Sequence, residues 1–151
     1  MDKLYFEEGL EEAIERIESI EERPILVAVY GWPDSGKSYL INKLGDCFAQ
    51  RGLEVARSSG GPYKDTFYIL RERAQYLRRL IFFHCAWVKE NKGERSLFKN
   101  EDPNYLAESI AGKKIHLNIG IYNPFLFPKP TGEYDLIIRN PESKKKSLQC
   151  C

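Results

Sequence analysis

An apolar run, a glycine-rich loop and a helical segment follow one another near the start of this chain. Ile25–Tyr30 is apolar throughout, Gly31–Ser38 reads Gly-Trp-Pro-Asp-Ser-Gly-Lys-Ser, and Tyr39–Gln50 has a helical composition. The loop fits the spacing Gly-x-x-x-x-Gly-Lys-Ser without a mismatch. A strand that passes through such a loop into a helix brings backbone N–H groups and the positive helix end close to phosphates. The sequence therefore predicts an α/β fold with a phosphate-binding site.

The residues of the loop suit a nucleoside triphosphate with Mg²⁺. Gly31 is expected to let the chain turn out of the strand, and Gly36 to let the backbone approach the phosphates. Lys37 supplies a mobile positive charge for the β- and γ-phosphates, and the Ser38 hydroxyl is the expected Mg²⁺ ligand. The alternative is a chance turn that caps a helix. The predicted nucleotide-binding residues are Gly31, Trp32, Pro33, Asp34, Ser35, Gly36, Lys37, Ser38 and Tyr39.

These residues resemble the Walker A loop of the P-loop NTPase superfamily. The resemblance implies a site for ATP or GTP with Mg²⁺, and it leaves kinase, ATPase and GTPase open. A GTPase would need an Asp-x-x-Gly switch and an Asn-Lys-x-Asp guanine reader, and neither pattern occurs in the sequence. We therefore expect ATP in preference to GTP.

The composition fits one domain whose charge is unevenly placed. The chain has 151 residues, 42% hydrophobic and 30% charged, and a net charge of +1, so broad nucleic-acid binding is not expected. Residues 1–24 hold nine acidic and three basic groups, a net charge of −6, which leaves +7 for the remainder. That basic excess suits a polyanionic ligand.

The sequence predicts a cytoplasmic protein. The longest apolar stretch, Leu80–Val88, is far shorter than the ~20 residues that cross a bilayer. A charged start followed by an apolar signal region is not seen at the N-terminus. Four cysteines without a Cys-x-x-Cys pair indicate a reducing environment, with neither a zinc site nor a disulfide framework.

Alternating strand and helix patterns predict a three-layer α/β/α sandwich with a mainly parallel sheet of about five strands. An amphipathic helix over residues 7–22, ended by Pro24, is expected to pack on the domain; a partner-binding helix is the alternative. We expect a single domain over residues 1–140 and a basic, flexible tail over 141–151. The predicted strands are Ile25–Tyr30, Leu53–Ser58, Leu80–Trp87, Ile115–Tyr122 and Tyr134–Arg139, and the other predicted helices are Ser38–Arg51, Thr66–Arg79 and Pro103–Ala111.

The layout is similar to small P-loop kinases of the uridine-kinase and nucleoside-monophosphate-kinase kind. Tyr134–Asn140 resembles their late strand, in which a tyrosine-aspartate pair enters an apolar strand that ends near asparagine. The resemblance implies a second-substrate loop at Ser58–Asp65, with Lys37 and Asp65 as the catalytic residues. For Asp65, a helix-capping role is the alternative.

Two departures from these kinases leave the activity open. His84 occupies the place of the aspartate expected at the tip of the third strand, and residues 123–133 leave no room for an arginine-bearing lid. A hydrogen-bonded core histidine is the preferred interpretation of His84 over a general base. We expect an ATP-dependent kinase with an unidentified small-molecule acceptor. The alternative is a nucleotide-binding regulatory module, or an NTP hydrolase with little phosphotransfer activity.

The end of the chain suggests a separate property. Lys144–Cys151 reads Lys-Lys-Lys-Ser-Leu-Gln-Cys-Cys, which resembles the C-terminus of Rab-type small GTPases, where two terminal cysteines are prenylated. That resemblance implies membrane attachment through Cys150 and Cys151. An unmodified flexible tail is the alternative.

Overall fold

The computed structural model describes residues 3–32, 34–58, 68, 71–72, 80–87, 89–91, 94–96, 103–130 and 133–141. Several predicted features lie outside the described residues. They include Pro33 of the glycine-rich loop, most of the helix expected at Thr66–Arg79, and the tail from residue 142 onward. The expected second-substrate loop is described only at Ser58, so Asp65 also lies outside.

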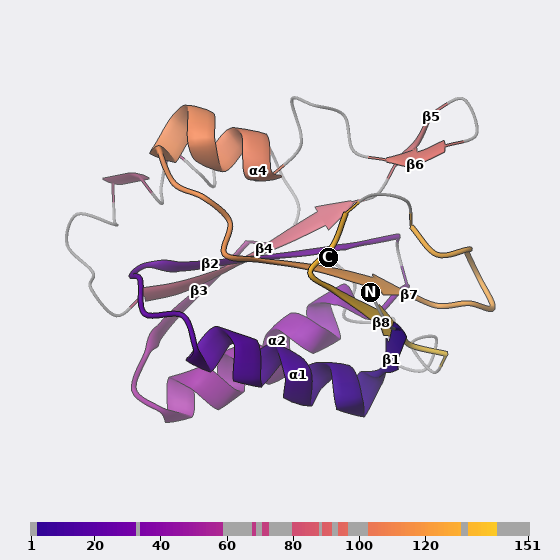
Figure 1. Cartoon of the computed structure of the whole chain (residues 1–151), viewed down its shortest axis with the longest axis horizontal. Helices are drawn as coiled ribbons and strands as arrows, with labels where there is room; N and C mark the ends of the chain where they lie inside the picture. Colours follow the sequence, from indigo (N-terminus) through magenta and orange to yellow (C-terminus); the bar gives the residue numbers. More distant parts are fainter. Residues whose placement is uncertain are drawn as a thin grey trace.

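The centre of the fold is a six-stranded sheet in which every neighbouring pair of strands is parallel (Figure 1). The strand order is β1-β8-β7-β2-β4-β3, so β2, which leads into the glycine-rich loop, lies between β7 and β4. This arrangement confirms the α/β class. The strands are β1 (Lys3–Tyr5), β2 (Ile25–Gly31), β3 (Glu54–Ser58), β4 (Leu80–Trp87), β7 (Leu117–Tyr122) and β8 (Leu136–Arg139).

The expectation of about five strands is wrong by one, because β1 adds an edge strand. Lys3, Leu4 and Tyr5 pair with residues 137–139 of β8. Three residues carry too little alternation to show as a strand in sequence, and this strand is defined by its partner. A two-stranded antiparallel hairpin, β5 (Lys89–Asn91) with β6 (Glu94–Ser96), was likewise not predicted.

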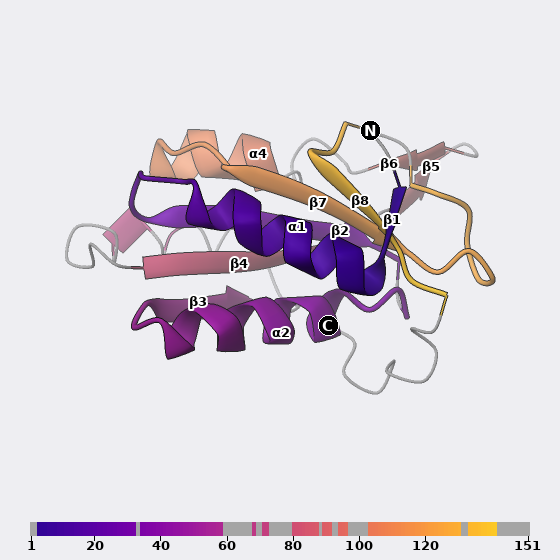
Figure 2. The same cartoon turned by 60° about the horizontal axis from the view of Figure 1, so that its bottom comes forward.

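Helices cover both faces of the sheet. Helices α1 (Phe6–Glu18) and α2 (Lys37–Gln50) lie on one face, and α4 (Pro103–Leu106), continued by the π-helical turn η2 (Ala107–Ala111), lies on the other (Figures 1 and 2). None of the helices in the described part of the chain is long and apolar enough to cross a membrane.

Helix α1 ends earlier than predicted. It stops at Glu18, and Ser19 caps its end: the Ser19 N–H donates to Glu15 O at 3.2 Å, and Ser19 Oγ donates to Arg16 O at 2.7 Å. Pro24 comes several residues later and does not end the helix. A serine hydroxyl competes for backbone groups in this way, so it can end a helix before a proline does.

The main core lies between the sheet and the helices α1 and α2. All seven residues of β2 are buried, and Val27 and Val29 face this core. Helix α1 contributes Ala13 and Ile17, which are fully buried, so it packs on the sheet. Full burial of each large aliphatic side chain contributes ~1.5–3 kcal/mol. This packing fixes the direction in which β2 delivers the chain to the loop.

Polar contacts join α4 to the opposite face of the sheet. Tyr30 OH donates to Asn118 Oδ1 at 2.5 Å, and Asn104 Nδ2 donates to Tyr30 OH at 2.9 Å. Asn104 belongs to α4, whereas Tyr30 and Asn118 belong to the neighbouring strands β2 and β7. The short helix is therefore attached to the sheet by a hydrogen-bonded network.

Candidate functional site

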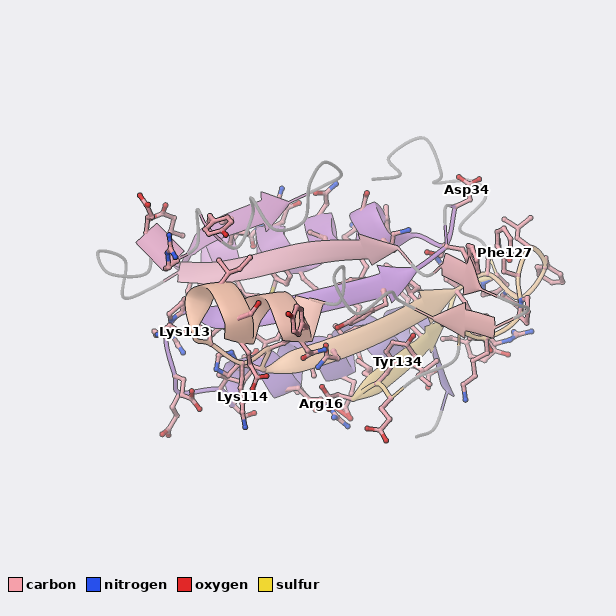
Figure 3. The ribbon with its side chains drawn as sticks, turned by 90° about the horizontal axis from the view of Figure 1, so that it is seen from above. Arg16, Asp34, Lys113, Lys114, Phe127 and Tyr134 are labelled. Carbon is pink, nitrogen blue, oxygen red and sulfur yellow. The ribbon has the colours of Figure 1, made fainter. Side chains whose placement is uncertain are left out.

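The glycine-rich loop lies where ligands bind in open parallel sheets. Strands β2, β4, β7 and β8 end at the same edge, with Gly31 beside Trp87 and Tyr122 beside Arg139. From β2 the chain passes through α2, on one face of the sheet, to β3. From β4 it passes through α4, on the other face, to β7, on the opposite side of β2 (Figure 1). The strand connections therefore run in opposite directions at β2. Such a switch point opens a crevice outside the carboxyl ends of the strands. Figure 3 shows Asp34 and Phe127 at this end of the molecule, and Lys113 and Lys114 at the opposite end.

The backbone of the loop turns through two left-handed residues before α2 begins. Asp34 has φ 63°, and Gly36, the residue before the helix, has φ 97°. Glycine adopts this conformation without steric cost, and aspartate tolerates it better than most residues. Gly36 therefore uses the conformational freedom of glycine, whereas its predicted approach to phosphates stays a prediction. It lets the chain reverse within the loop and present the first turn of α2 to the edge of the sheet.

Gly31 is needed for space rather than for a turn. A Cβ at Gly31 would lie 2.5 Å from Ser35 Oγ and 2.6 Å from Ile121 O. Its φ is not among the positive values of the described chain, so the expected turning role is wrong. The absent side chain instead allows the loop to fold back against β7 at the end of β2.

The start of α2 is electrostatically open to an anion. In this fully described helix, no acidic residue lies in the first turn, and Gly36 provides no capping side chain. Helix α1 differs, because Glu7 and Glu8 lie in its first turn. Unpaired N–H groups and the helix dipole give a helix N-terminus a partial positive charge. At α2 that charge is reinforced by Lys37, the first residue of the helix.

Lys37 is buried within the loop. Its side chain is only 1% exposed, and Nζ donates to Trp32 O at 2.8 Å. A buried ammonium group is costly unless polar groups face it. The lysine is thus held over the loop backbone, where water screens its charge little.

Ser35 and Asn140 connect the loop to the far strand β8. Asn140 Nδ2 donates to Ser35 O at 3.2 Å, and the Asn140 N–H donates to Tyr122 O at 2.8 Å. Ser35 and Asn140 are each 2% exposed. Ser35 Oγ is buried and has no hydrogen-bond partner among the described residues. The sequence predicted a strand that ends near Asn140 but did not predict the contact of Asn140 with the loop.

The segment after β7 forms a second wall beside the loop. The Phe127 ring stacks on Trp32, with centroids 5.0 Å apart and planes 18° from parallel. Asn123 holds the segment in shape: its Oδ1 accepts the Phe125 N–H at 2.9 Å, and its carbonyl accepts the N–H groups of Leu126 and Phe127 at 3.1 and 3.0 Å. These contacts were not predicted, because only the position of Asn123 at the strand end was visible in the sequence.

The remaining predicted residues have different positions. Ser38 is half-buried in the first turn of α2, at the loop. The Tyr39 ring packs on Phe6, with centroids 5.3 Å apart, so its backbone belongs to the loop end but its side chain points toward α1. That ring also lines a shallow cavity of about 360 Å³ with Asn42, Lys43, Asp46 and Arg57.

His84 is not at the tip of its strand. It pairs with Ala28 and Ser58 in the middle of the sheet, and β4 continues to Trp87 beside Gly31. The expectation that His84 replaces a strand-tip aspartate is therefore wrong in position, although no carboxylate stands at Trp87 either. Among the described residues, no group of three His, Cys, Asp or Glu side chains could hold a metal ion.

Comparison with protein-family models, with curated proteins and with solved structures found no match to this chain.

Proposed function

We propose that this protein binds the triphosphate of ATP through Gly31–Tyr39, in a fold of the P-loop NTPase type. The observation that carries the proposal is Lys37, buried at the start of helix α2, whose N-cap is a glycine, and held over the loop backbone. A buried cation at a helix N-terminus is complementary to a polyanion. A parallel sheet with β2 at its switch point and helices on both faces supports the three-layer P-loop type.

The donors of the loop fit a phosphate. Ser35 Oγ is a buried hydroxyl without a partner among the described residues. A phosphate oxygen would satisfy it, and the charge of the phosphate would offset that of Lys37. Ser38 would hold Mg²⁺ by its hydroxyl. A single protein ligand suits this ion, which keeps several waters and phosphate oxygens around it. ATP remains preferred to GTP for lack of a guanine-reading motif in the sequence.

The reaction we propose is transfer of the γ-phosphate to a small, nucleoside-type acceptor. Lys37 would stabilise the charge on the transferred group, and Asp65 would accept the proton of the attacking hydroxyl. What supports this assignment is the similarity of the sequence layout to small nucleoside kinases, together with a pre-shaped loop at the edge of the sheet.

A regulatory nucleotide-binding module, or a slow NTP hydrolase, is the second candidate. It is favoured by the short segment from Asn123 to Glu133, which joins β7 to β8 with no lid helix in its described part. It is also favoured by Trp87 at the end of β4, where a kinase would have a carboxylate. A protein that holds a nucleotide without transferring phosphate needs neither a lid helix nor a carboxylate at the end of this strand.

Calorimetry tests nucleotide binding. We expect the full chain to bind Mg·ATP, and Lys37→Met to raise its Kd. Hydrogen bonds to charged groups contribute ~1.5–3 kcal/mol, which corresponds to a roughly 10- to 150-fold change. Lys113→Met is the matched control, because Lys113 is exposed at the opposite end of the sheet. Absence of any binding heat with ATP or GTP at millimolar concentration would overturn the proposal.

Acceptor-dependent turnover separates the two candidates. ADP release from Mg·ATP is measured with a panel of nucleosides, sugars and vitamins, using wild type and Lys37→Met. Release that requires one acceptor and is lost in the variant identifies a kinase. Binding of ATP without acceptor-dependent release identifies the module, and slow release regardless of acceptor identifies the hydrolase.

A further inference from the structure

Asp34 has a backbone conformation that only glycine adopts without steric cost. Its φ is 63°, and in the described part of the chain no other residue except glycine has a positive φ. The same loop uses a glycine for this conformation at Gly36, whose φ is 97°. Residues held in sparsely populated backbone regions cluster at functional sites. An aspartate at this position therefore indicates a function for its carboxylate.

The carboxylate of Asp34 balances the charge of Lys37 within the loop. These two residues are the charged ones in Gly31–Ser38, so the loop has no net charge. Figure 3 shows the Asp34 side chain projecting from the loop at the end of the molecule where β2 ends. The N-terminus of α2 adds only a partial positive charge. The loop is therefore less attractive to a highly charged anion than Lys37 alone would make it.

Other charged groups of both signs lie at this end of the sheet. Strand β1 pairs with β8 up to Tyr5 and Arg139. It leads directly into α1, which places Glu7 and Glu8 at this end too. All of these groups stay in place when Asp34 alone is replaced. A comparison of aspartate with asparagine at this one position therefore isolates the charge of Asp34.

The charge of Asp34 distinguishes two forms of a nucleotide. Mg²⁺ neutralises part of the charge of a triphosphate. A carboxylate in the loop repels the free triphosphate more strongly than the magnesium complex, because repulsion grows with the charge of the ligand. We propose that Asp34 makes the glycine-rich loop selective for the magnesium complex over the free nucleotide. The inference rests on the proposed function, because it concerns the same loop and the same ligand.

Calorimetry with Mg·ATP, and with ATP in EDTA, tests the selectivity. In the wild-type protein we expect a higher Kd for free ATP than for Mg·ATP. Asp34→Asn should lower the Kd for free ATP about 5-fold or more and change the Kd for Mg·ATP by less than about 2-fold. Asparagine tolerates a positive φ as aspartate does, so the turn is kept. High salt should reduce the difference between the two proteins, because it screens the repulsion.

Two variants serve as controls. Asp46→Asn removes the same charge from an exposed position of α2. This position is ~13 Å along the helix from Lys37, beyond the ~10 Å over which charges act at 0.1 M salt, so the ratio of the two Kd values should stay that of the wild type. Ser38→Ala should narrow the ratio in the other way, by raising the Kd for Mg·ATP, because it removes the expected Mg²⁺ ligand.

The possible results separate this inference from the proposed function. Normal binding of Mg·ATP with an unchanged ratio in Asp34→Asn would overturn the inference and leave the proposed function standing. Equal weakening of both ligands would also overturn it, because Asp34 would then only shape the turn. A loss confined to Mg·ATP would assign Asp34 to metal binding instead. Absence of binding heat with either ligand in the wild-type protein at millimolar concentration would overturn the proposed function together with the inference.

Discussion

Gly31→Ala tests whether close packing at the end of β2 shapes the loop. The added methyl group would lie 2.5 Å from Ser35 Oγ and 2.6 Å from Ile121 O. The serine hydroxyl can rotate away, but the carbonyl of Ile121 belongs to β7, which pairs with β2 and β8. The carbonyl cannot retreat without disturbing both ladders. The strain therefore falls on the loop, which must move away from β7.

The expected cost follows from this geometry. Overpacking by one methyl group against rigid atoms destabilises a core by about 1–3 kcal/mol. Displacement of Ser35 also strains the bond from Asn140 Nδ2 to Ser35 O. If that bond is lost, the buried carbonyl contributes a penalty of about 1–3 kcal/mol to binding or folding. We expect a lower free energy of unfolding and a Kd for Mg·ATP raised about 10-fold or more.

Gly9→Ala is the matched control. Its Cβ would lie 2.5 Å from Ile138 Cγ1, so the same methyl group is overpacked between α1 and β8, and its three nearest atoms all belong to Ile138 and none to the loop. Urea unfolding should show a loss of stability in both variants, and calorimetry should show weaker Mg·ATP binding only in Gly31→Ala. Wild-type affinity in Gly31→Ala would refute the reasoning, and an equal loss of affinity in Gly9→Ala would show that the effect is not specific to the loop.

Three further substitutions test individual contacts. Asn140→Ala should raise the Kd for Mg·ATP roughly 5- to 100-fold by calorimetry, because it removes the donor to Ser35 O; unchanged affinity would show that this bond does not shape the loop. His116→Ala should lower unfolding stability by about 1–3 kcal/mol, since the buried Leu26 N–H donates to His116 Nδ1 at 3.0 Å, and His116→Asn should restore part of it. Gly112→Ala should lower the free energy of unfolding by about 1–2 kcal/mol through its φ of 61° alone, because nothing lies within 4 Å of a Cβ there, and the affinity for Mg·ATP should not change. For His116→Ala and Gly112→Ala, full wild-type stability in urea unfolding would contradict the assigned contact or strain.

Local signals predicted the central part of the fold. The apolar run of β2 and the helical face of α2 are long enough to be visible without their partners, and both elements form within a residue of the predicted positions. Strand β1 and the hairpin of β5 and β6 are three residues each, and their pairing partners define them. At the early end of α1 the Ser19 hydroxyl bonds to Arg16 O and competes with a helical continuation, and hydrophobic periodicity does not report this bond.

In the candidate site, too, the sequence predicted local features and missed contacts between distant segments. The spacing Gly31 to Ser38 is local, so the sequence could predict a glycine-rich loop between β2 and α2, although it did not predict the left-handed conformation of Gly36. The bond from Asn140 to Ser35 joins residues 105 positions apart, and the stacking of Phe127 on Trp32 also joins distant segments. Such contacts depend on strand order and register, which the pattern of one sequence does not fix. The function of Gly31 was misjudged for this reason, because Ile121 was not known to be its neighbour.

The bracing of the loop bears on the choice between a kinase and a regulatory module. A nucleotide can switch a protein only through an element that has two arrangements of nearly equal free energy. The glycine-rich loop lies close against β7 at Gly31, is bonded to Asn140 after β8, and stacks through Trp32 on the ring of Phe127. Because Asn123 fixes the segment that carries Phe127, that brace is itself held. A loop supported in this way through β7 and the residues around it is suited to hold phosphates in one geometry, as phosphoryl transfer requires, and it is poorly suited to act as the moving part of a switch.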